Sequence, residues 1–260
     1  MSRLRQLKPL LREILGGSDF AARLPELNAW PPRQVTGPLF SLLLDPDELI
    51  RWRAVTGFGH VLAQLAGHAV EKAAGPSGGQ AQGMEQARVL MRLCMWRLNE
   101  ESGNLGWGTP ECMGEAMARH EGLALEYHRI LASYIIDDPD REGNFLDHAL
   151  LRRGVYWGLG RLAQVRPHLV FPAEPALLAA LAEEEDRANR GLAAWTLGIL
   201  AAPAALVPLR GLEASLDPVD LYHDGGIERT TVGQLASEAI ACILNAEKAA
   251  PTAPRPGLQA

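Results

Sequence analysis

The sequence has few cysteines and few lysines, and both shortages restrict what the chain can be. Its three cysteines, Cys94, Cys112 and Cys242, are odd in number and far apart. They do not suggest a disulfide framework, so we expect a reduced compartment and a cytoplasmic location. Only 3 of the 25 basic residues are lysine, and the formal net charge is −6. This acidic balance argues against a general nucleic-acid-binding surface.

Long apolar runs and strand patterns are scarce as well. No apolar run reaches the roughly 18 residues that a membrane-spanning helix needs, and the first 15 residues lack the pattern of a signal peptide. Aromatic residues make up 6% of the chain, although 47% of it is hydrophobic. Alanine and leucine dominate, and alternation of Val, Ile and Thr is rare. The composition therefore predicts an all-α protein with no membrane segment.

Apolar residues recur at helical spacing in segments that follow one another as pairs, a shorter helix and then a longer one. The clearest runs from residue 47 to 67, where large apolar side chains, among them Trp52, return at steps of three and four and predict core packing. Residues 72–83 are small and Gly-rich and predict a surface loop. Residues 220–229 also predict a loop, which precedes a last helix over 230–247.

Four of the longer helices align without gaps, and the alignment indicates an internal repeat. The aligned segments begin at residues 51, 106, 152 and 190, and each has a glycine at its ninth position. Because small residues let neighbouring helices approach closely, we expect these glycines to occupy equivalent positions between successive units. They are Gly59, Gly114, Gly160 and Gly198.

This pattern resembles HEAT repeats. The R-x-x-A-x-x-x-L-G arrangement of residues 190–198 and the TTVGQLASEAI segment are similar to the PBS-lyase HEAT-like subtype. The resemblance covers roughly residues 36–245 and implies a right-handed α-solenoid of about five helix pairs with a concave binding face. The chain then divides into an N-terminal helical cap or arm (1–35), a repeat domain (36–247) and a disordered tail (248–260).

The stretch 99–119 holds the highest density of polar and special residues in the chain. Three glycines within 103–108 predict irregular backbone, because glycine is costly inside a helix and permissive outside one. Thr109 and Pro110 then predict a helix start, with Thr109 as the N-cap and Pro110 at the first helical position. Glu111 would follow in the first turn, where a carboxylate suits the helix dipole.

Trp107, Glu111 and Glu115 follow one another at four-residue intervals. If the helix extends back to Trp107, the three side chains share one face, and an indole beside carboxylates would line a ligand or partner pocket. The alternative is a long loop whose acids are solvated and whose Trp107 fills the core.

Arginines near the starts of the longer helices extend this candidate surface. Arg51, Arg152 and Arg190 form a row if the units stack regularly, which suits an acidic or phosphorylated partner. The alternative is that they brace neighbouring units by pairing with Glu and Asp. The predicted partner- or ligand-binding residues are Asn99, Glu101, Trp107, Glu111, Glu115, Arg152, Arg153 and Trp157.

Enzymatic alternatives rest on resemblance to other HEAT-type proteins. The DNA alkylation-repair family holds a cationic nucleobase with Trp, Asp and Arg, and Trp107, Glu111 and Arg152 could imitate that set. This alternative requires Glu111 and Arg152 to converge in one cleft. The PBS-lyase subtype instead implies a lyase or chaperone with a pocket large enough for a tetrapyrrole.

Metal and thiol chemistry have little support in the sequence. HEAT-type di-iron hydroxylases use several His-Glu pairs, and only His120-Glu121 fits here, so we expect no metal site. Cys112 lies near a predicted helix N-terminus, where its pKa could be lowered, but a buried structural thiol is the simpler interpretation. Cys94 and Cys242 fall on apolar stripes and predict core positions.

We therefore predict a HEAT-like scaffold or adaptor, more an interaction protein than an enzyme, that uses no cofactor. Its partner would be another protein, with an acidic segment as one candidate, bound through the concave face and the loop and helix of 99–119. The alternatives are a binder or enzyme for a cationic nucleobase and a cofactor lyase or chaperone.

Overall fold

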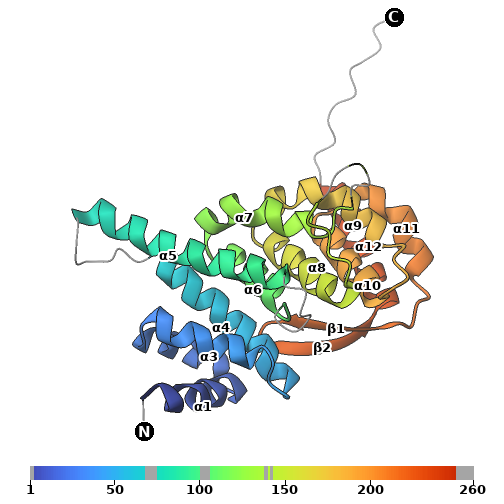
Figure 1. The fold of residues 1–260 in the computed structure, drawn as a ribbon. Coiled ribbons are helices and arrows are strands. Elements are labelled where there is room, and N and C mark those ends of the chain that lie inside the picture. Colours follow the sequence, from blue (N-terminus) through green and yellow to red (C-terminus); the bar gives the residue numbers. More distant parts are fainter. Residues whose placement is uncertain (1–2, 68–74, 100–105, 138–139, 141–142, 250–260) are drawn as a thin grey trace, which may run out of the picture.

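Helices make up most of the computed structural model, which describes residues 3–67, 75–99, 106–137, 140 and 143–249 (Figure 1). Ten of the helices form five consecutive pairs in the described part of the chain. The pairs are α3 (Pro32–Leu42) with α4 (Glu48–Gly67), α5 (Gly75–Leu98) with α6 (Thr109–Arg119), α7 (Glu121–Ser133) with α8 (Ala149–Ala163), α9 (Glu174–Ala180) with α10 (Ala188–Ile199), and α11 (Leu206–Leu212) with α12 (Val232–Ala249).

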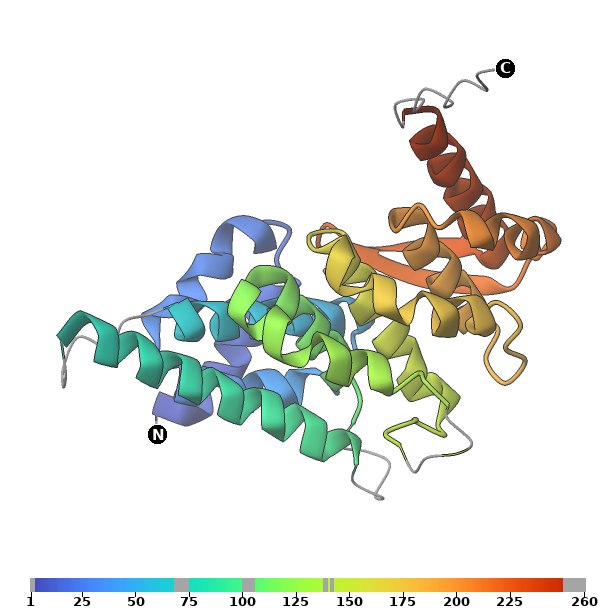
Figure 2. The same ribbon diagram turned by 90° about the horizontal axis from the view of Figure 1, so that it is seen from above.

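The second helices of the pairs stack on one another in chain order and form a continuous row. α4 packs on α6, α6 on α8, α8 on α10, and α10 on α12. We call these five helices the inner helices. Figure 2 shows the result from above, with α12 on the opposite side of the molecule from α5. The predicted all-α solenoid of about five helix pairs is confirmed.

The inner helices approach so closely that the four repeat glycines have no room for a side chain. A Cβ atom at any of them would overlap an atom of the next inner helix. The four glycines therefore occupy equivalent positions, as the alignment predicts. The residues that such a Cβ would meet are Glu115 on α6 for Gly59, Gly158 on α8 for Gly114, Trp195 on α10 for Gly160, and Ala239 on α12 for Gly198.

The N-terminal segment packs against the first pair. Helix α1 (Arg3–Gly16) contacts α3 and α4, and its Leu11 and Ile14 are fully buried. A short helix, α2 (Phe20–Arg23), and a 3₁₀ segment (Leu24–Ala29) follow. This arrangement covers one end of the row of inner helices. The division into cap, repeat domain and tail stays a prediction.

Residues 220–229 form a β-hairpin, and the prediction of a loop there is wrong. Strand β1 (Pro218–His223) pairs antiparallel with β2 (Gly226–Thr231), with His223 opposite Gly226. Asp224 and Gly225 make the turn with φ of +49° and +78°. Positive φ at both positions is the geometry of a two-residue hairpin turn, for which Asp-Gly is a favoured sequence.

Two further boundaries differ from the sequence prediction. Residues 75–83, predicted as loop, begin helix α5, whose first turn contains Pro76, where a missing N–H costs nothing. Residues 72–74 lie outside the described residues. Helix α12 extends to Ala249, so the first two residues of the predicted tail are helical. The rest of the predicted tail, 250–260, also lies outside the described residues.

The hairpin lies across the row of inner helices and runs from the last pair toward the first (Figure 1). Near its base, Val219 packs against Gly191 of α10. At its middle, the carbonyl of Tyr222 accepts a 2.9 Å hydrogen bond from Trp157 Nε1 of α8. At its tip, the carbonyl of Gly225 accepts a 2.9 Å hydrogen bond from Arg53 Nε of α4. The hairpin thus connects units that lie far apart in the chain.

The close packing of the inner helices predicts that Gly114→Ala is destabilising. The new methyl group would meet the backbone of Gly158, which cannot move aside as a side chain can, so we expect a loss of about 1–3 kcal/mol in the free energy of unfolding. Gly211→Ala in α11 is the matched control, because a Cβ atom placed there would have no other atom within 4 Å. We expect the control to be neutral or up to about 1 kcal/mol more stable. Denaturant unfolding measures the free energy of unfolding of both variants. Equal stability of the two would contradict the close packing of α6 against α8 at Gly114.

Candidate functional site

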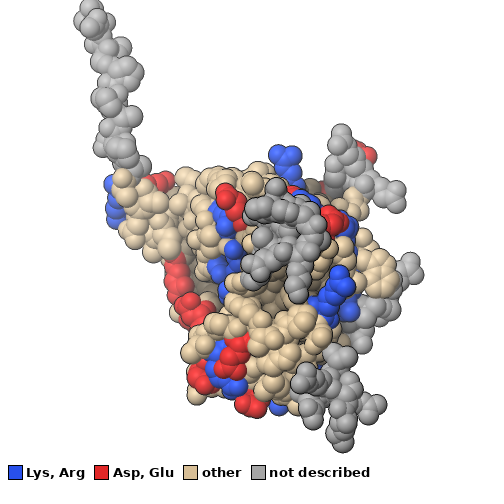
Figure 3. Space-filling model, turned by 90° about the vertical axis from the view of Figure 1, so that its left-hand side faces the viewer, with Lys and Arg blue, Asp and Glu red and all other residues tan. Residues whose placement is uncertain are grey.

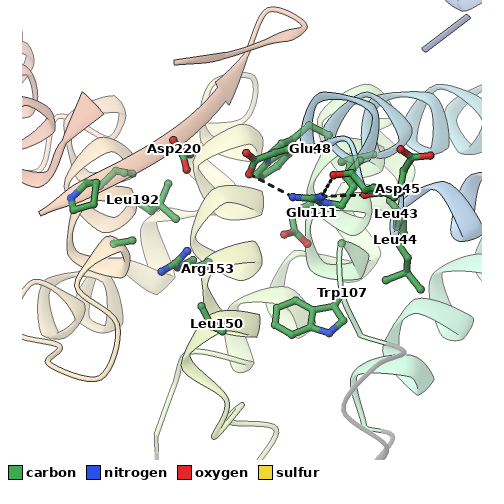
Figure 4. A pocket seen from close by; sticks show the side chains of 18 residues that line it. Leu43, Leu44, Asp45, Glu48, Trp107, Glu111, Leu150, Arg153, Leu192 and Asp220 are labelled. Carbon is green, nitrogen blue, oxygen red and sulfur yellow. Dashed lines mark hydrogen bonds and ion pairs between the residues drawn. The ribbon is translucent and has the colours of Figure 1, made fainter. Parts of the chain in front are cut away.

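A cleft of about 750 Å³ opens where the N-terminal halves of four inner helices meet strand β1 (Figure 4). We call it the inner cleft. One wall is the turn between α3 and α4, and the opposite wall is formed by α8, α10 and β1. The residues that represent each element are Asp45 in the turn, Trp52 on α4, Glu111 on α6, Arg153 on α8, Leu192 on α10 and Asp220 on β1.

The start of α6 places Glu111 at the centre of this cleft. Gly108 is the N-cap residue, with φ of +75°, and the first helical hydrogen bond runs from the N–H of Cys112 to its carbonyl at 3.0 Å. Thr109, predicted as the N-cap, is instead the first helical residue. Its hydroxyl donates back to the carbonyl of Gly106, so it does not cap the helix. The helix does not reach back to Trp107, which precedes it in the turn.

The carboxyl group of Glu111 lies against α8, and one of its oxygens lacks a hydrogen-bond partner. A Cβ atom at Gly154 would be only 2.5 Å from Glu111 Cδ, so the glycine makes room for the carboxyl group. Its Oε2 atom is buried and accepts no hydrogen bond from the residues described. Burial raises the pKa of Glu111 to about 7, and its own main-chain N–H lowers it by less. Near neutral pH this group therefore exists in both protonation states.

Acidic side chains outnumber basic ones in the lining of the inner cleft. Asp45, Glu48 and Asp220 join Glu111, against Arg51 and Arg153. Both arginines already have partners. Arg51 Nη1 donates to the carbonyls of the α3–α4 turn at 2.9 and 3.2 Å. Arg153 forms a bidentate ion pair outside the cleft with Asp186. Two of the acids are paired as well, Asp45 with Arg12 at 2.8 Å and Glu48 with Arg51 at 3.6 Å.

The mouth of the cleft is apolar. Leu44 is 50% exposed and Leu150 is 42% exposed, which is unusual for large apolar side chains beside a cleft. Trp107 lies between them, half-buried, with its ring edge-on to His148 at 5.6 Å between centroids. On the side of the molecule toward α5, by contrast, basic and acidic side chains are interspersed (Figure 3). The inner cleft differs from that surface because it has an apolar rim, formed by Leu44 and Leu150, and an acidic floor, formed by Glu111.

The structure brings together only part of the predicted binding set. Trp107, Glu111 and Arg153 line the inner cleft. Glu115, one turn after Glu111, is buried and lines a second cleft of about 610 Å³, where Arg161 Nε donates to it at 2.6 Å. Trp157 is buried and also borders that second cleft.

The remaining predicted residues lie elsewhere. Arg152 is buried, donates to the carbonyl of Leu146 at 2.6 Å and forms ion pairs with Glu183 and Glu185 at 3.0 and 2.7 Å. It borders a different cavity, so the prediction that Arg152 and Glu111 converge is wrong. Asn99 is exposed at the end of α5 and does not line the inner cleft. Glu101 lies outside the described residues.

The predicted arginine row braces the chain instead of facing a partner. Each member donates to a carbonyl in the turn before its own helix, as Arg152 does at Leu146. Arg51 reaches Asp45 O and Arg190 reaches Glu183 O. The alternative of pairing with acids of a neighbouring unit holds for Arg152, which pairs with Glu183 and Glu185 of the next pair. Arg51 and Arg190 pair instead with acids of their own units, Glu48 and Glu184.

Two of the three thiols are buried in the described structure. Cys94 and Cys112 are buried, and burial raises the pKa of Cys94 to about 12 and that of Cys112 well above its usual value. Cys242 is exposed, so the prediction of a core position for it is wrong. Among the residues described, no group of three or more His, Cys, Asp and Glu could hold a metal ion. Their helices include none that is both long and apolar enough to cross a membrane.

The sequence prediction misses two contributors to the cleft. Asp220 arrives on the hairpin, in a stretch whose residues predict a loop. Trp52 has the spacing of a core residue, yet it lines the cleft and stacks on Tyr222 with 5.1 Å between ring centroids and 10° between planes. The repeat alignment contains a signal, because Trp52 and Trp107 both occupy the second position of their segments.

Comparison with known families matches residues 149–200, from the start of α8 to the end of α10, to the HEAT-like repeat. This segment is similar to a HEAT-like repeat. It contains Gly160, at which α8 and α10 meet, and the side of the inner cleft formed by Arg153 and Leu192. The predicted resemblance is confirmed here. A comparison with curated proteins gave no match.

Solved structures with a similar arrangement of helices include designed proteins. An engineered protein from a structural genomics consortium has a TM-score of 0.48 at 13% identity, over 94% of this chain and 98% of that chain. A second one has a TM-score of 0.47 at 16% identity, over 94% and 100%. A designed armadillo repeat protein has a TM-score of 0.43 at 15% identity, over 90% and 99%.

The buried carboxyl group beside the HEAT-like repeat predicts a specific pH dependence of stability. The pKa of Glu111 is raised from 4.5 to about 7 in the folded protein, so between these values the folded state binds more protons than the unfolded state. Its contribution to stability is therefore complete below pH 4.5 and is lost as pH rises through 7. We expect the free energy of unfolding of Glu111→Gln, relative to that of the wild type, to increase by about 1 kcal/mol or more between pH 5 and pH 8.

Denaturant unfolding at pH 5, 6.5 and 8 measures this gain. Glu121→Gln is the control, because Glu121 is an exposed carboxylate in the first turn of α7. The other charged groups of the cleft are unchanged in both variants and cancel in the comparison. A difference between Glu111→Gln and wild type that is the same at all three pH values would contradict the burial of this carboxyl group.

Proposed function

We propose that the protein is a scaffold that binds a segment of another protein in the inner cleft. The observation that carries this proposal is the exposed apolar rim over an acidic floor. Large exposed apolar side chains that border a concavity are typical of interaction sites. Leu44 and Leu150 border this one from opposite walls, which belong to the first and third pairs.

The shape of the cleft suits an elongated ligand. Its lining comes from four successive inner helices and from β1, so a bound segment would contact one unit after another. In repeat proteins such a row of units makes an extended binding surface on a rigid support. The tight seams at the repeat glycines supply that rigidity here.

The charges argue for a partner segment that is not acidic. The expectation of an acidic segment depends on the arginine row, and Arg51, Arg152 and Arg190 donate to carbonyls of their own turns. An anionic cofactor or a nucleic-acid backbone would meet the same acidic floor. We therefore propose neither the lyase nor the nucleobase alternative.

Site-specific photo-crosslinking tests the proposal. A benzoylphenylalanine in place of Leu150 should crosslink a protein partner in the cells that make this protein. The same substitution at Val207 on α11, which is 79% exposed and far from the cleft lining, is the control and should not crosslink that partner.

Trp107→Ala should reduce the Leu150 crosslink several-fold, because Trp107 forms part of the wall of the cleft. Trp107 also packs against the core, so unfolding curves are recorded to confirm that the variant is folded under the crosslinking conditions. Equal crosslinking from Leu150 and Val207, or a Leu150 crosslink that ignores Trp107→Ala, would show that the inner cleft is not the binding site.

A further inference from the structure

The partner chemistry of the inner cleft is set by one group that lacks a partner. Glu111 has a buried oxygen with no hydrogen bond among the described residues, at the floor of a cleft that a ligand can enter. A buried carboxyl oxygen without a donor is costly, so native structures usually supply one. The cations in the same lining are Arg51 and Arg153, and both are held by other acceptors. The buried oxygen, Oε2, lies against Gly154, but Glu111 as a residue is only partly buried and lines the cleft, so a ligand can reach the carboxyl group through its other oxygen.

We propose that the inner cleft recognises a lysine side chain of the bound segment, whose ammonium group donates to Glu111. This inference rests on the proposed function and names the residue that the partner presents. Because Oε2 is buried against α8, Glu111 offers the cleft a single accessible carboxyl oxygen. One acceptor oxygen suits the point-like ammonium group of lysine better than the planar fork of arginine, which prefers two.

Two indole rings line the path to Glu111. Trp52 and Trp107 both belong to the lining, and each is held by a second ring. Tyr222 stacks on Trp52, and His148 lies edge-on to Trp107. Indole faces attract cations and pack well against methylene groups. The four-carbon stem of lysine would lie against apolar surface from the rim to the floor, while its charge reaches the carboxylate.

The surrounding charges favour the same ligand. Asp45, Glu48 and Asp220 stand around the cleft and attract a cation before it reaches Glu111. Several of these charges are paired: Arg51 with Glu48 at 3.6 Å, Asp45 with Arg12 at 2.8 Å, and Arg153 with Asp186. Glu111 has no such ion pair among the described residues, so its ionised form favours a cation over a glutamate or aspartate of a partner.

Lysine binding should depend on pH because it requires the ionised form of Glu111. Below pH 7 the ligand must displace a proton from the carboxyl group, so we expect affinity to fall as pH decreases from 8 to 6. His148 is the histidine beside Trp107 in the described structure. A His148→Gln variant therefore separates any titration of His148 from that of Glu111.

The test uses the full chain and short peptides as probes. Acetyl-Ala-Lys-Ala-amide is compared with versions that carry norleucine, arginine or glutamate in place of lysine. Binding is followed by the indole N–H signals of the six tryptophans in nitrogen-15 correlation spectra. We expect the lysine peptide to shift indole signals and to bind about tenfold more tightly than the norleucine or arginine peptide.

Glu111→Gln should reduce lysine-peptide binding about tenfold and remove the fall in affinity between pH 8 and pH 6. This variant keeps the shape of the side chain, and unfolding curves confirm that it folds. Glu121→Gln, outside the cleft, should bind like the wild type. Equal binding of the lysine and norleucine peptides, arginine binding as tight as lysine, or unchanged lysine binding in Glu111→Gln would each overturn the proposal.

The outcomes also separate this inference from the proposed function. A partner that crosslinks at Leu150 and is unaffected by Glu111→Gln would support a protein-binding cleft and overturn lysine recognition. Lysine-selective binding that is lost in Glu111→Gln, without any crosslink at Leu150, would support the lysine site and overturn the scaffold role.

Discussion

The close approach of the inner helices is the constraint on which the rest of the structure depends. Gly59, Gly114, Gly160 and Gly198 each face an atom of the next inner helix at a separation that leaves no room for a Cβ. Because each glycine lets its helix pack directly against the next one, on backbone at Gly114 and Gly198 and on a side chain at Gly160, the N-terminal ends stay in register along one edge of the row. The inner cleft lies along that edge, so its walls are as rigid as the seams beneath them. Gly154 extends the same principle, since its missing side chain is what admits the carboxyl group of Glu111.

Helix α6 departs from the repeat, and the departure creates the site. Three of the four aligned segments begin with an arginine that braces the turn before its helix, whereas the α6 segment begins with Gly106. At the position of Glu111, the other segments have Thr56, Trp157 and Trp195. The α6 unit therefore has a carboxyl group where the other three have neutral side chains, and it lacks their bracing arginine. The three regular units supply the helical framework, and the α6 unit supplies the carboxyl group of the candidate site.

The sequence is sufficient for the framework because its signals are local. Helical periodicity and the spacing of small residues are visible within short segments, and they identify the helix pairs and the four seam glycines. The hairpin escapes prediction although its turn, Asp224-Gly225, is a favoured local signal, because its strands are short and β1 packs against residues that are remote in the sequence. Tyr222 packs on Trp52 and Trp157, and both precede it by 65 residues or more.

The details of the site depend on helix rotation, which periodicity alone does not fix. Arg152 and Arg153 are consecutive, yet Arg153 borders the inner cleft and Arg152 a separate cavity, because neighbours on a helix point about 100° apart. Spacing could place Glu111 near Trp107, but it could not show which arginine would face them.

The contact between the hairpin tip and α4 links the two ends of the array. Tandem repeats normally behave as one-dimensional chains that can fray from either end, since each unit touches only its neighbours. Here Arg53 and Gly225 are joined across 172 positions of sequence, and Gly225 also lies beside Phe20. Local unfolding of the two ends is therefore coupled. Neither the first pair nor the hairpin can unfold without breaking the hydrogen bond between Arg53 and Gly225. A contact between residues so distant in the sequence also raises the contact order, so we expect the array to fold slowly and as one cooperative unit.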